Sequence, residues 1–490
     1  MTASAVESPV RGLHIGGEWT AAEGGKTFED SDPFTGDVVA NVPAGTREDA
    51  RRAIAAAAEA FPAWSETPPA ARQQIFLKAA DILEARGEEV VSWLTRETGA
   101  TFGMAMFQLH FVPGLFRQAA ALPYQSTGEI IPSDTGAFAM GLRRPVGVVA
   151  AIAPWNAALI LSARSIAAPL ALGNTVVLKP SELSPYVGGL IWAEIFSEAG
   201  LPEGVLNIVT HAPGEAGPIA EEFAEHPEVR VINFTGSTET GRKVAEAAGR
   251  NLTRVLLELG GSNPLVVLGD ADLEYAVDAA AFGSFFHQGQ ICMSARRIIV
   301  EKPIADDFVQ RLVEKTKGLK AGNPGEQDTI IGPLITEEAV STVKSRVDEA
   351  VQKGAKVLAG GEADGSVYQA TLLTNVSRDT EFAQEETFGP VASIEIVADA
   401  DQAVDRANDT AYGLSAGIIT SDPDRGLALA QRIQSGIVHV NDQPVGDEPQ
   451  MPFGGVKGSG FGRFGGTAAI NEFTEIHWVT VQSGSHPFPF

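Results

Sequence analysis

The only cysteine of the chain, Cys292, stands among residues that leave room for chemistry. It ends the run Phe-His-Gln-Gly-Gln-Ile-Cys, in which most neighbours are small or polar. A thiolate is a strong nucleophile, so such a cysteine could form a covalent bond to a substrate carbon. A lone free cysteine is more often a small hydrophobic core residue, so its interpretation depends on the other residues available to it.

Glu258 places a carboxylate at the end of an apolar run, Val-Leu-Leu-Glu-Leu at residues 255–259. Burial of an unpaired carboxylate is costly, so such a group raises its pKa or finds a partner. A raised pKa is how a general base is tuned toward neutral pH. The alternative is a charge at a strand end that is simply solvated or paired.

Asn156 follows Pro154 and Trp155 at the end of another apolar run. Open α/β sheets bind their ligands beyond the carboxyl ends of such strands. A side-chain amide there can donate to a developing oxyanion, an interaction worth about 3 kcal/mol in the transition state. Taken alone, an asparagine after a proline is usually part of a turn.

Short runs rich in valine and isoleucine must position Asn156 and Glu258. Most are separated by enough residues for a crossover helix, which predicts a doubly wound α/β domain with a parallel sheet. A capping box at Thr46 and Asp49 and a proline pair at 68–69 predict two amphipathic helices before it. The runs cover residues 146–153, 175–179, 205–209, 229–234 and 255–259.

After Gly260 the strand and helix signals continue, and they predict a second α/β domain. The cleft between two such domains is a natural ligand site. Residues 128–144 and 474–482 fit neither core, and the second of these alternates as a strand does. We expect both to form an arm that reaches a neighbouring subunit.

The composition excludes several classes of partner. The chain has 490 residues with 62 acidic and 36 basic side chains, a formal charge of −26, which would repel nucleic acid. Its start lacks a secretory pattern, and it contains no run of about 18 apolar residues. We therefore expect a cytoplasmic protein without a membrane partner. A single cysteine excludes an intrachain disulfide and a multi-cysteine metal site, and we expect no metal.

Seven motifs along the chain resemble, in order, the signatures of the aldehyde dehydrogenase superfamily. The similarity spans essentially the whole chain, and the 34 residues from Glu258 to Cys292 resemble the family spacing. One motif would be weak, but seven in register are specific. They are Pro-Trp-Asn (154–156), Leu-Lys-Pro-Ser-Glu (178–182), Phe-Thr-Gly-Ser-Thr-Glu-Thr-Gly (234–241), Leu-Glu-Leu-Gly-Gly (257–261), Gly-Gln-Ile-Cys (289–292), Glu-Glu-Thr-Phe-Gly-Pro (385–390) and Pro-Phe-Gly-Gly (452–455).

The resemblance implies an α/β fold with two doubly wound domains and a small β arm for oligomerisation. The chain is then expected to be a homodimer or a homotetramer. The expected division is residues 1–126 and 146–258 for an NAD-binding domain, 259–458 for a catalytic domain, 127–145 and 471–490 for the arm, and 459–470 for a segment that packs back on the NAD-binding domain.

The resemblance also implies a mechanism. Cys292 adds to the aldehyde carbon, and the Asn156 amide and the Cys292 backbone N–H hold the oxyanion. Hydride loss leaves a thioester, and Glu258 activates the water that releases the acid. Family members that transfer the acyl group to coenzyme A tend to lack this base, so Glu258 favours hydrolysis.

The implied cofactor is NAD, with NADP as an alternative. A carboxylate at Glu182 would accept hydrogen bonds from the adenosine ribose and repel a 2′-phosphate, which favours NAD. Ser237 would lie near the pyrophosphate at a helix N-terminus. Gly236 and Gly241 also mimic half of a phosphate-binding P-loop, but the Lys-Ser/Thr pair it requires is missing. The cofactor-binding residues expected from the resemblance are Trp155, Lys179, Ser181, Glu182, Gly236, Ser237, Leu259, Glu386 and Phe388.

Three residues bear on the aldehyde. Arg164 lies near the expected substrate entrance. An arginine at this position resembles the pattern of two branches of the family: the succinate semialdehyde dehydrogenases, and the benzaldehyde, vanillin and salicylaldehyde dehydrogenases. The succinate semialdehyde branch is similar in its first arginine but looks as though it binds the substrate carboxylate with a second arginine as well. This chain has Phe286 at that second position. Phe286 and Phe453 could instead pack against an aromatic ring. We expect an aromatic aldehyde; a succinate-semialdehyde-type or aliphatic aldehyde is the alternative.

Two functions of other classes remain open. A cysteine hydrolase would use His287, close in sequence to Cys292, as its base and would work without NAD. In that case His287→Ala would abolish activity. A non-catalytic protein that kept the fold would form no NADH with any aldehyde.

Overall fold

The apolar runs of the first half of the chain form the centre of an eight-stranded sheet in the computed structural model, which describes residues 10–125, 128–485 and 487–490. The order is β2-β1-β9-β8-β7-β10-β11-β21. The five strands from β9 to β11 are parallel, as predicted, and the outer strands pair antiparallel. Their bounds are β1 Leu13–Ile15, β2 Glu18–Thr20, β7 Val148–Ile152, β8 Thr175–Lys179, β9 Leu206–Ile208, β10 Val229–Thr235, β11 Arg254–Glu258 and β21 Gly460–Phe461.

Alternating side chains of the central strands bury both faces of this sheet. On β7, Val148, Ala150 and Ile152 join one core, and Val149 and Ala151 join the other. This alternation explains why most positions of the runs are apolar. The first core is covered by α1 (Arg47–Ser65), α8 (Ala216–Glu225) and α9 (Thr238–Arg250), and the second by α2 (Pro69–Ala85), α3 (Gly87–Thr98), α4 (Phe102–Ala119), α6 (Ala158–Ala171) and α7 (Ile191–Ala199).

Both predicted N-terminal helices are present. Helix α1 begins at the capping box in which Thr46 and Asp49 satisfy each other's backbone N–H groups. Helix α2 has Pro69 in its first turn, where the missing N–H costs nothing. Short elements beside them are β3 (Thr27–Ser31), β4 (Val38–Pro43) and α5 (Leu122–Gln125).

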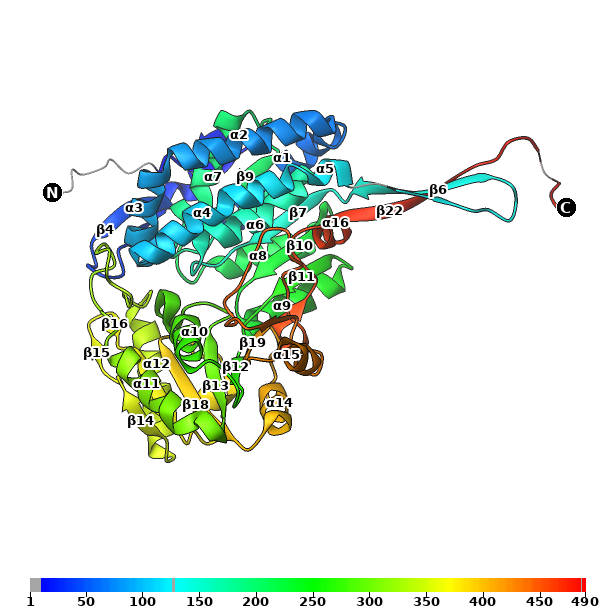
Figure 1. Cartoon of the computed structure of the whole chain (residues 1–490). Helices are drawn as coiled ribbons and strands as arrows, with labels where there is room; N and C mark the ends of the chain where they lie inside the picture. The colour runs from blue at the N-terminus through cyan, green and yellow to red at the C-terminus, as the bar shows by residue number, and fades with distance from the viewer. Residues whose placement is uncertain (1–9, 126–127, 486) are drawn as a thin grey trace.

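A second sheet, of seven strands, forms the lower domain in Figure 1, in the order β14-β17-β18-β13-β12-β19-β20. It is parallel except for β14. Helices α10 and α11 cover one face, and α14 and α15 the other. The bounds are β12 Asn263–Val267, β13 Ala295–Glu301, β14 Lys356–Ala359, β17 Thr371–Thr374, β18 Val391–Val397, β19 Ser415–Ile419, β20 Ile437–Val440, α10 Leu273–Phe285, α11 Ala305–Lys317, α12 Glu337–Gln352, α13 Glu381–Gln384, α14 Ala400–Asn408 and α15 Pro423–Ala430.

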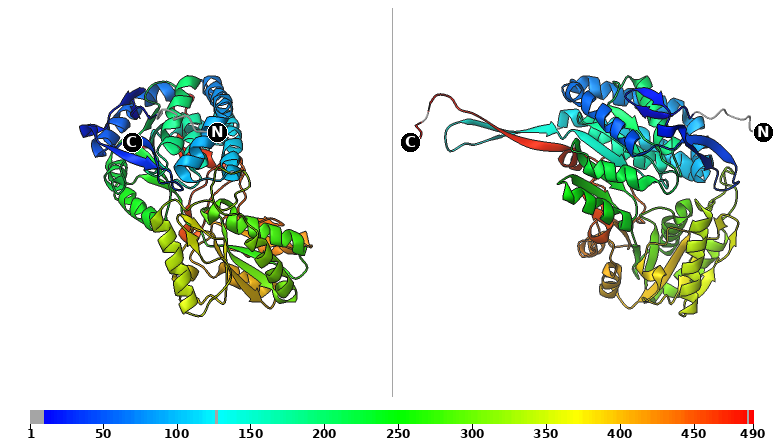
Figure 2. Two further views of the ribbon diagram at one scale, coloured as in Figure 1. Left: turned by 90° about the vertical axis from the view of Figure 1, so that its left-hand side faces the viewer. Right: turned by 180° about the vertical axis from the view of Figure 1, so that it is seen from behind.

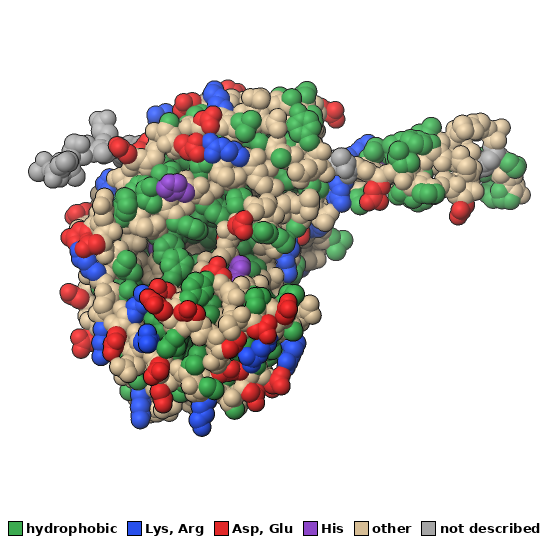
Figure 3. All heavy atoms as spheres, viewed as in Figure 1, with side chains coloured by type: hydrophobic (Ala, Val, Ile, Leu, Met, Phe, Trp, Pro, Cys, Tyr) green, Lys and Arg blue, Asp and Glu red, His purple; other side chains and the backbone are tan. Residues whose placement is uncertain are grey.

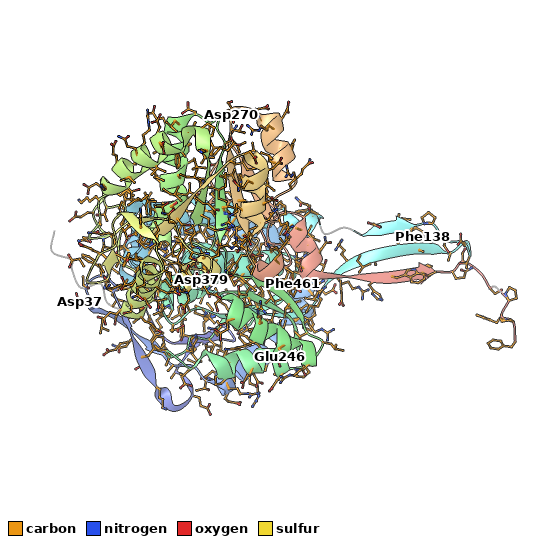
Figure 4. All side chains as sticks on the ribbon, turned by 90° about the horizontal axis from the view of Figure 1, so that it is seen from below. Asp37, Phe138, Glu246, Asp270, Asp379 and Phe461 are labelled. Atoms are coloured by element: carbon orange, nitrogen blue, oxygen red, sulfur yellow. The ribbon has the colours of Figure 1, made fainter. Side chains whose placement is uncertain are left out.

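Three strands leave the two domains as a long arm (Figures 1 and 2). They are β5 (Glu129–Ile131), β6 (Phe138–Pro145) and β22 (Thr474–Val481), and they pair antiparallel in the order β22-β6-β5. Helix α16 (Ala468–Phe473) leads into β22. The two segments that fit neither predicted core therefore pair with each other, and Figure 4 shows Phe138 on the projecting part.

Some sequence-based statements concern residues outside the described part of the chain. Residues 1–9 belong to the segment in which no secretory pattern was found, and residues 126, 127 and 486 belong to the predicted domain ranges. Among the described residues, no helix combines the length and the apolar character that crossing a membrane requires.

Candidate active site

The carboxyl ends of four adjacent strands hold most of the predicted site. In the order β8, β7, β10 and β11, they are followed or ended by Lys179, Asn156, Gly236 and Glu258. Parallel strands present these ends at one edge of the sheet, so residues far apart in sequence are brought together there. Cys292 approaches from the other domain, after α10 and before β13.

The backbone around Cys292 is held by two asparagines. Asn156 donates from Nδ2 to the Gln290 carbonyl at 2.9 Å, and Asn263 donates from Nδ2 to the Cys292 carbonyl at 2.7 Å. An amide nitrogen carries two hydrogens, so Asn156 keeps a second one for an oxyanion. Gly261 must be glycine, because a Cβ there would lie 2.3 Å from the Cys292 carbonyl oxygen.

A left-handed segment precedes Cys292. His287 and Gln288 have φ of 51° and 54°, and Gly289 follows with 67°. Such backbone is costly for residues other than glycine and is found where a structure must aim a side chain. Gln288 is held there because its Nε2 donates to the Pro333 carbonyl at 3.0 Å.

The surroundings of the half-buried Cys292 favour the neutral thiol. Loss of hydration raises the pKa of the thiol well above its ordinary value, and the carboxylates of Glu386 and Glu258 raise it further. The guanidinium of Arg164 acts in the opposite direction. These surroundings therefore favour the protonated thiol, and attack on a substrate requires that proton to leave.

Glu258 is the buried carboxylate that its position in an apolar run predicts. Its side chain lies at the end of β11 and is 3% exposed, and neither oxygen has a hydrogen-bond partner of normal geometry within the described residues. Burial raises the pKa of Glu258 well above 4.5, although the charges of Arg164 and Arg463 oppose the shift. A carboxylate in this state can accept a proton near neutral pH.

His211 contacts both Lys179 and Glu182. His211 Nδ1 lies 2.9 Å from the Ala212 carbonyl, which can only accept, so Nδ1 carries the ring hydrogen. Nε2 is then an acceptor and receives a hydrogen bond from Lys179 Nζ at 2.7 Å. Glu182 Oε2 lies 3.7 Å from His211 Nε2. Burial lowers the pKa of Lys179 to about 8 and that of His211 to about 4.

The turn from β10 to α9 has the form of an anion site. Ser237 caps α9 by accepting from the Thr240 N–H at 3.2 Å, and the helix N-terminus faces outward. Gly236 has no room for a side chain, because a Cβ would lie 2.6 Å from the Phe234 ring. Leu259 packs under the helix, 2.4 Å from where a Cβ on Gly241 would be.

The remaining expected cofactor residues lie on both domains. Glu386 accepts from the Gly261 N–H at 2.9 Å, and burial raises its pKa to about 7. Phe388 has φ of 53° and meets the edge of the Trp155 ring at a centroid distance of 5.5 Å. Ser181 donates to Glu182 at 3.2 Å.

These groups fit a dinucleotide cofactor. Lys179 and Glu182 provide a donor and an acceptor suited to ribose hydroxyls, and the α9 N-terminus suits a pyrophosphate. The carboxylate of Glu386 is one of the charges that raise the pKa of the Cys292 thiol.

Aromatic side chains run from the surface toward Cys292. Phe282 and Phe107 are 46% and 39% exposed, and both contact Phe286, at centroid distances of 4.7 Å and 5.8 Å. Phe107 also contacts Phe111 at 6.1 Å. Phe286 packs against the same hydrophobic core as Cys292. Figure 3 shows hydrophobic side chains gathered along the boundary of the two domains on this face.

Arg164 continues this wall, and it is paired with an acid. Its guanidinium lies 4.4 Å from the Phe453 ring centroid and 5.8 Å from that of Phe111. Its Nη2 donates to Asp447 Oδ2, and both side chains are buried. The two interpretations of Arg164, near the substrate or paired with an acid, are therefore compatible.

Several of these residues were not predicted from the sequence. They are His211, Asp447, Phe107, Phe111 and Phe282. His211 carried a usable signal, because it follows a predicted parallel strand, as Asn156 does. The others lie on helices and loops that only the tertiary fold brings to the site.

His287 does not have the surroundings of a catalytic base. The ring is fully buried, and neither nitrogen has a hydrogen-bond partner of normal geometry within the described residues. Burial lowers its pKa to about 4. An assignment of His287 as partner base of Cys292 therefore has no support from its contacts.

Residues 19–479 match the aldehyde dehydrogenase family. The chain is 49% identical over 478 residues to a vanillin dehydrogenase from Pseudomonas fluorescens, covering 97% of this chain and 99% of the relative. It is 44% identical to a salicylaldehyde dehydrogenase from Pseudomonas putida, covering 98% and 99%. A crystal structure of a salicylaldehyde dehydrogenase from Pseudomonas putida G7, complexed with salicylaldehyde, superposes with a TM-score of 0.95 at 42% identity, covering 98% and 99%. With matches of this extent, and the seven motifs placed around one site, the chain belongs to the aldehyde dehydrogenase family.

Proposed function

We propose that this aldehyde dehydrogenase oxidises uncharged aromatic aldehydes to carboxylic acids, with Cys292 as nucleophile, Glu258 as base for water and Asn156 as oxyanion donor. The observation that carries the substrate class is the wall of aromatic rings leading to Cys292, in which the cation Arg164 is neutralised by Asp447. Aromatic surfaces pack well against a substrate ring.

In the chemical steps, Cys292 loses its thiol proton to solvent water, its Sγ forms a bond to the aldehyde carbon, and the carbonyl oxygen becomes an oxyanion. The free N–H of Asn156 and the Cys292 backbone N–H stabilise that charge. NAD(P), when bound, supplies the hydride acceptor. Glu258 takes a proton from water as the water oxygen attacks the thioester carbon, and the C–S bond breaks to release the acid.

The alternative substrate, succinate semialdehyde, carries a carboxylate that needs a free cation. Arg164 already has an acidic partner, and Phe286 stands where the resemblance to succinate semialdehyde dehydrogenases implies a second arginine. The buried pair is electrically neutral, so an incoming carboxylate would gain little from it. The relatives named for vanillin and salicylaldehyde support the same substrate class.

A substrate panel tests this proposal. We expect NAD(P)H formation, followed by absorbance, to show kcat/KM for benzaldehyde, vanillin or salicylaldehyde at least about tenfold above that for succinate semialdehyde or a short aliphatic aldehyde, a difference of about 1.4 kcal/mol. Equal or higher efficiency with succinate semialdehyde would contradict the aromatic assignment. No turnover of any aldehyde would contradict the catalytic roles as well.

We propose NAD rather than NADP as the preferred cofactor, because the Glu182 carboxylate would lie beside a 2′-phosphate. Glu182→Gln removes that repulsion, and we expect the ratio of the dissociation constants for NADP and NAD to fall about tenfold or more. Binding is measured by calorimetric titration, which needs no substrate. Glu198→Gln, an exposed carboxylate on α7, is the matched control and should leave the ratio unchanged. A ratio that stays the same in Glu182→Gln would reject this role.

We propose that the arm carries the contact between subunits. It exposes large apolar side chains that a monomer would leave in water: Ile130, Ile131, Phe138, Ile476, Trp478 and Val481. Figure 3 shows these hydrophobic surfaces along the arm. Trp478→Asp places a charge in this contact and is expected to convert the oligomer to monomers, measured by light scattering during size exclusion. Val351→Asp on α12, also an exposed apolar residue, should not, and an oligomer unaffected by Trp478→Asp would refute the assignment.

A further inference from the structure

Asp447 is a buried carboxylate inside the aromatic wall that leads to Cys292. It lies in the loop after β20, and its side chain is 9% exposed. Oδ2 accepts from Arg164 Nη2, and Oδ1 has no hydrogen-bond partner within the described residues. Asp447 and Phe453 also border a cavity of about 290 Å³ beside β20. The carboxylate is thus buried, and within the described residues Arg164 is its side-chain hydrogen-bond partner.

The pair acts on the reacting groups. Arg164 and Asp447 are both among the charges that shift the pKa of Cys292 and of Glu258, and they do so with opposite signs. The guanidinium of this pair also lies against the rings of Phe453 and Phe111, so the pair is part of the aromatic wall. Without Asp447, the guanidinium would be an uncompensated cation near the site.

A free guanidinium in an apolar wall is a strong binding site for a carboxylate. A guanidinium that already faces a carboxylate is not, because the incoming anion meets the repulsion of the resident one. A neutral ring substituent meets no such repulsion, and it can still hydrogen-bond to the pair. The arrangement therefore discriminates by charge rather than by size.

We propose that Asp447 is a specificity-determining residue, which acts as the internal counter-ion of Arg164 and excludes anionic aldehydes from the site. This inference rests on the proposed function, since it assigns a substrate preference to the same site. It predicts that removing one negative charge from the protein creates an activity toward negatively charged aromatic aldehydes.

The test compares substrates of similar shape and different charge. The three positional isomers of formylbenzoate are anions, and their methyl esters are neutral. In Asp447→Asn, we expect kcat/KM for at least one formylbenzoate, relative to its methyl ester, to rise about ten- to a hundredfold over the unmodified protein. Asp447→Ser removes the same charge with a smaller side chain and should show the same direction, so the result does not depend on one variant folding well.

Two control variants separate this mechanism from a general change of charge. Glu448→Gln removes the adjacent, exposed carboxylate and should leave the ratio unchanged. Arg164→Gln combined with Asp447→Asn should abolish the gain, because the gain requires the cation. A ratio that is unchanged in both Asp447 variants, or a gain that persists without Arg164, overturns the inference.

A second measurement does not use aldehydes. Because Arg164 would act on Cys292 without its counter-ion, the alkylation of the thiol by iodoacetamide should reach half of its maximal rate at a lower pH in Asp447→Asn. An unchanged alkylation profile would also count against the inference. Failure of the proposed function looks different, since the unmodified protein would then oxidise neither benzaldehyde nor the methyl esters.

Discussion

Replacement of Cys292 by alanine is expected to reduce NAD(P)-dependent aldehyde oxidation by at least about 10⁴-fold, while NAD(P) binding changes by less than about twofold. The magnitude follows from what is lost when the nucleophile of an acyl-transfer site is removed. Binding should persist because the groups expected to hold the cofactor, such as Lys179 and Ser237, lie on the strand ends of the first domain. Turnover is measured by NAD(P)H absorbance and binding by calorimetry.

The single cysteine makes the control for this prediction unusually clean. In the protein without substitutions, one equivalent of iodoacetamide should alkylate Cys292. Loss of activity should parallel this alkylation, because no other thiol is present. Met293→Leu, at the neighbouring buried position, tests for a general disturbance of the segment and should retain most activity. Substantial oxidation by the alanine variant would reject Cys292 as the nucleophile.

Much of the fold follows from the sequence because its signals are local. Runs that form central strands, such as β7, β8 and β10, are apolar at most positions and stand out in a single chain. The central strand β12 was not predicted as a separate element. It begins five residues after Glu258 of β11, so it stands very close to the run that was predicted. The antiparallel edge strands are only two or three residues long and have no periodicity to detect.

The site was predictable where its residues lie in motifs, and not where they act through the fold. Asn156 follows β7 and Glu258 ends β11, so the parallel arrangement of the strands was enough to predict that the two side chains lie at the same edge of the sheet. Asp447 comes from a loop that is 283 residues away from Arg164 in sequence, and no spacing argument connects them. The ionisation state of Cys292 was also beyond a sequence argument. Burial and nearby carboxylates favour its neutral thiol, and both depend on the tertiary fold.

Replacement of Glu258 by glutamine is expected to separate the two halves of the reaction. Acylation of Cys292 should still occur, so one equivalent of NAD(P)H should form in a burst. Release of the acid should then be slower by about 10²- to 10⁴-fold, the usual contribution of a general base. Glutamine keeps the size and the burial of the side chain at the end of β11 but has no basic oxygen. Rapid mixing with excess aldehyde measures the burst and the steady rate in one experiment.

The pH dependence gives this prediction a second, independent test. Glu258 must be ionised to accept a proton from water, and burial raises its pKa above 4.5. The steady-state rate of the unmodified protein should therefore fall as pH falls through that raised pKa, and level off above it. Glu258→Gln should lack this limb, while Glu472→Gln, a carboxylate of α16 whose pKa burial also raises, should keep it. If Glu258→Gln retained both a fast steady-state rate and the pH-dependent fall, another group would activate water. The next residue to replace would then be Glu386, because its pKa is raised to about 7 and its charge acts on Cys292.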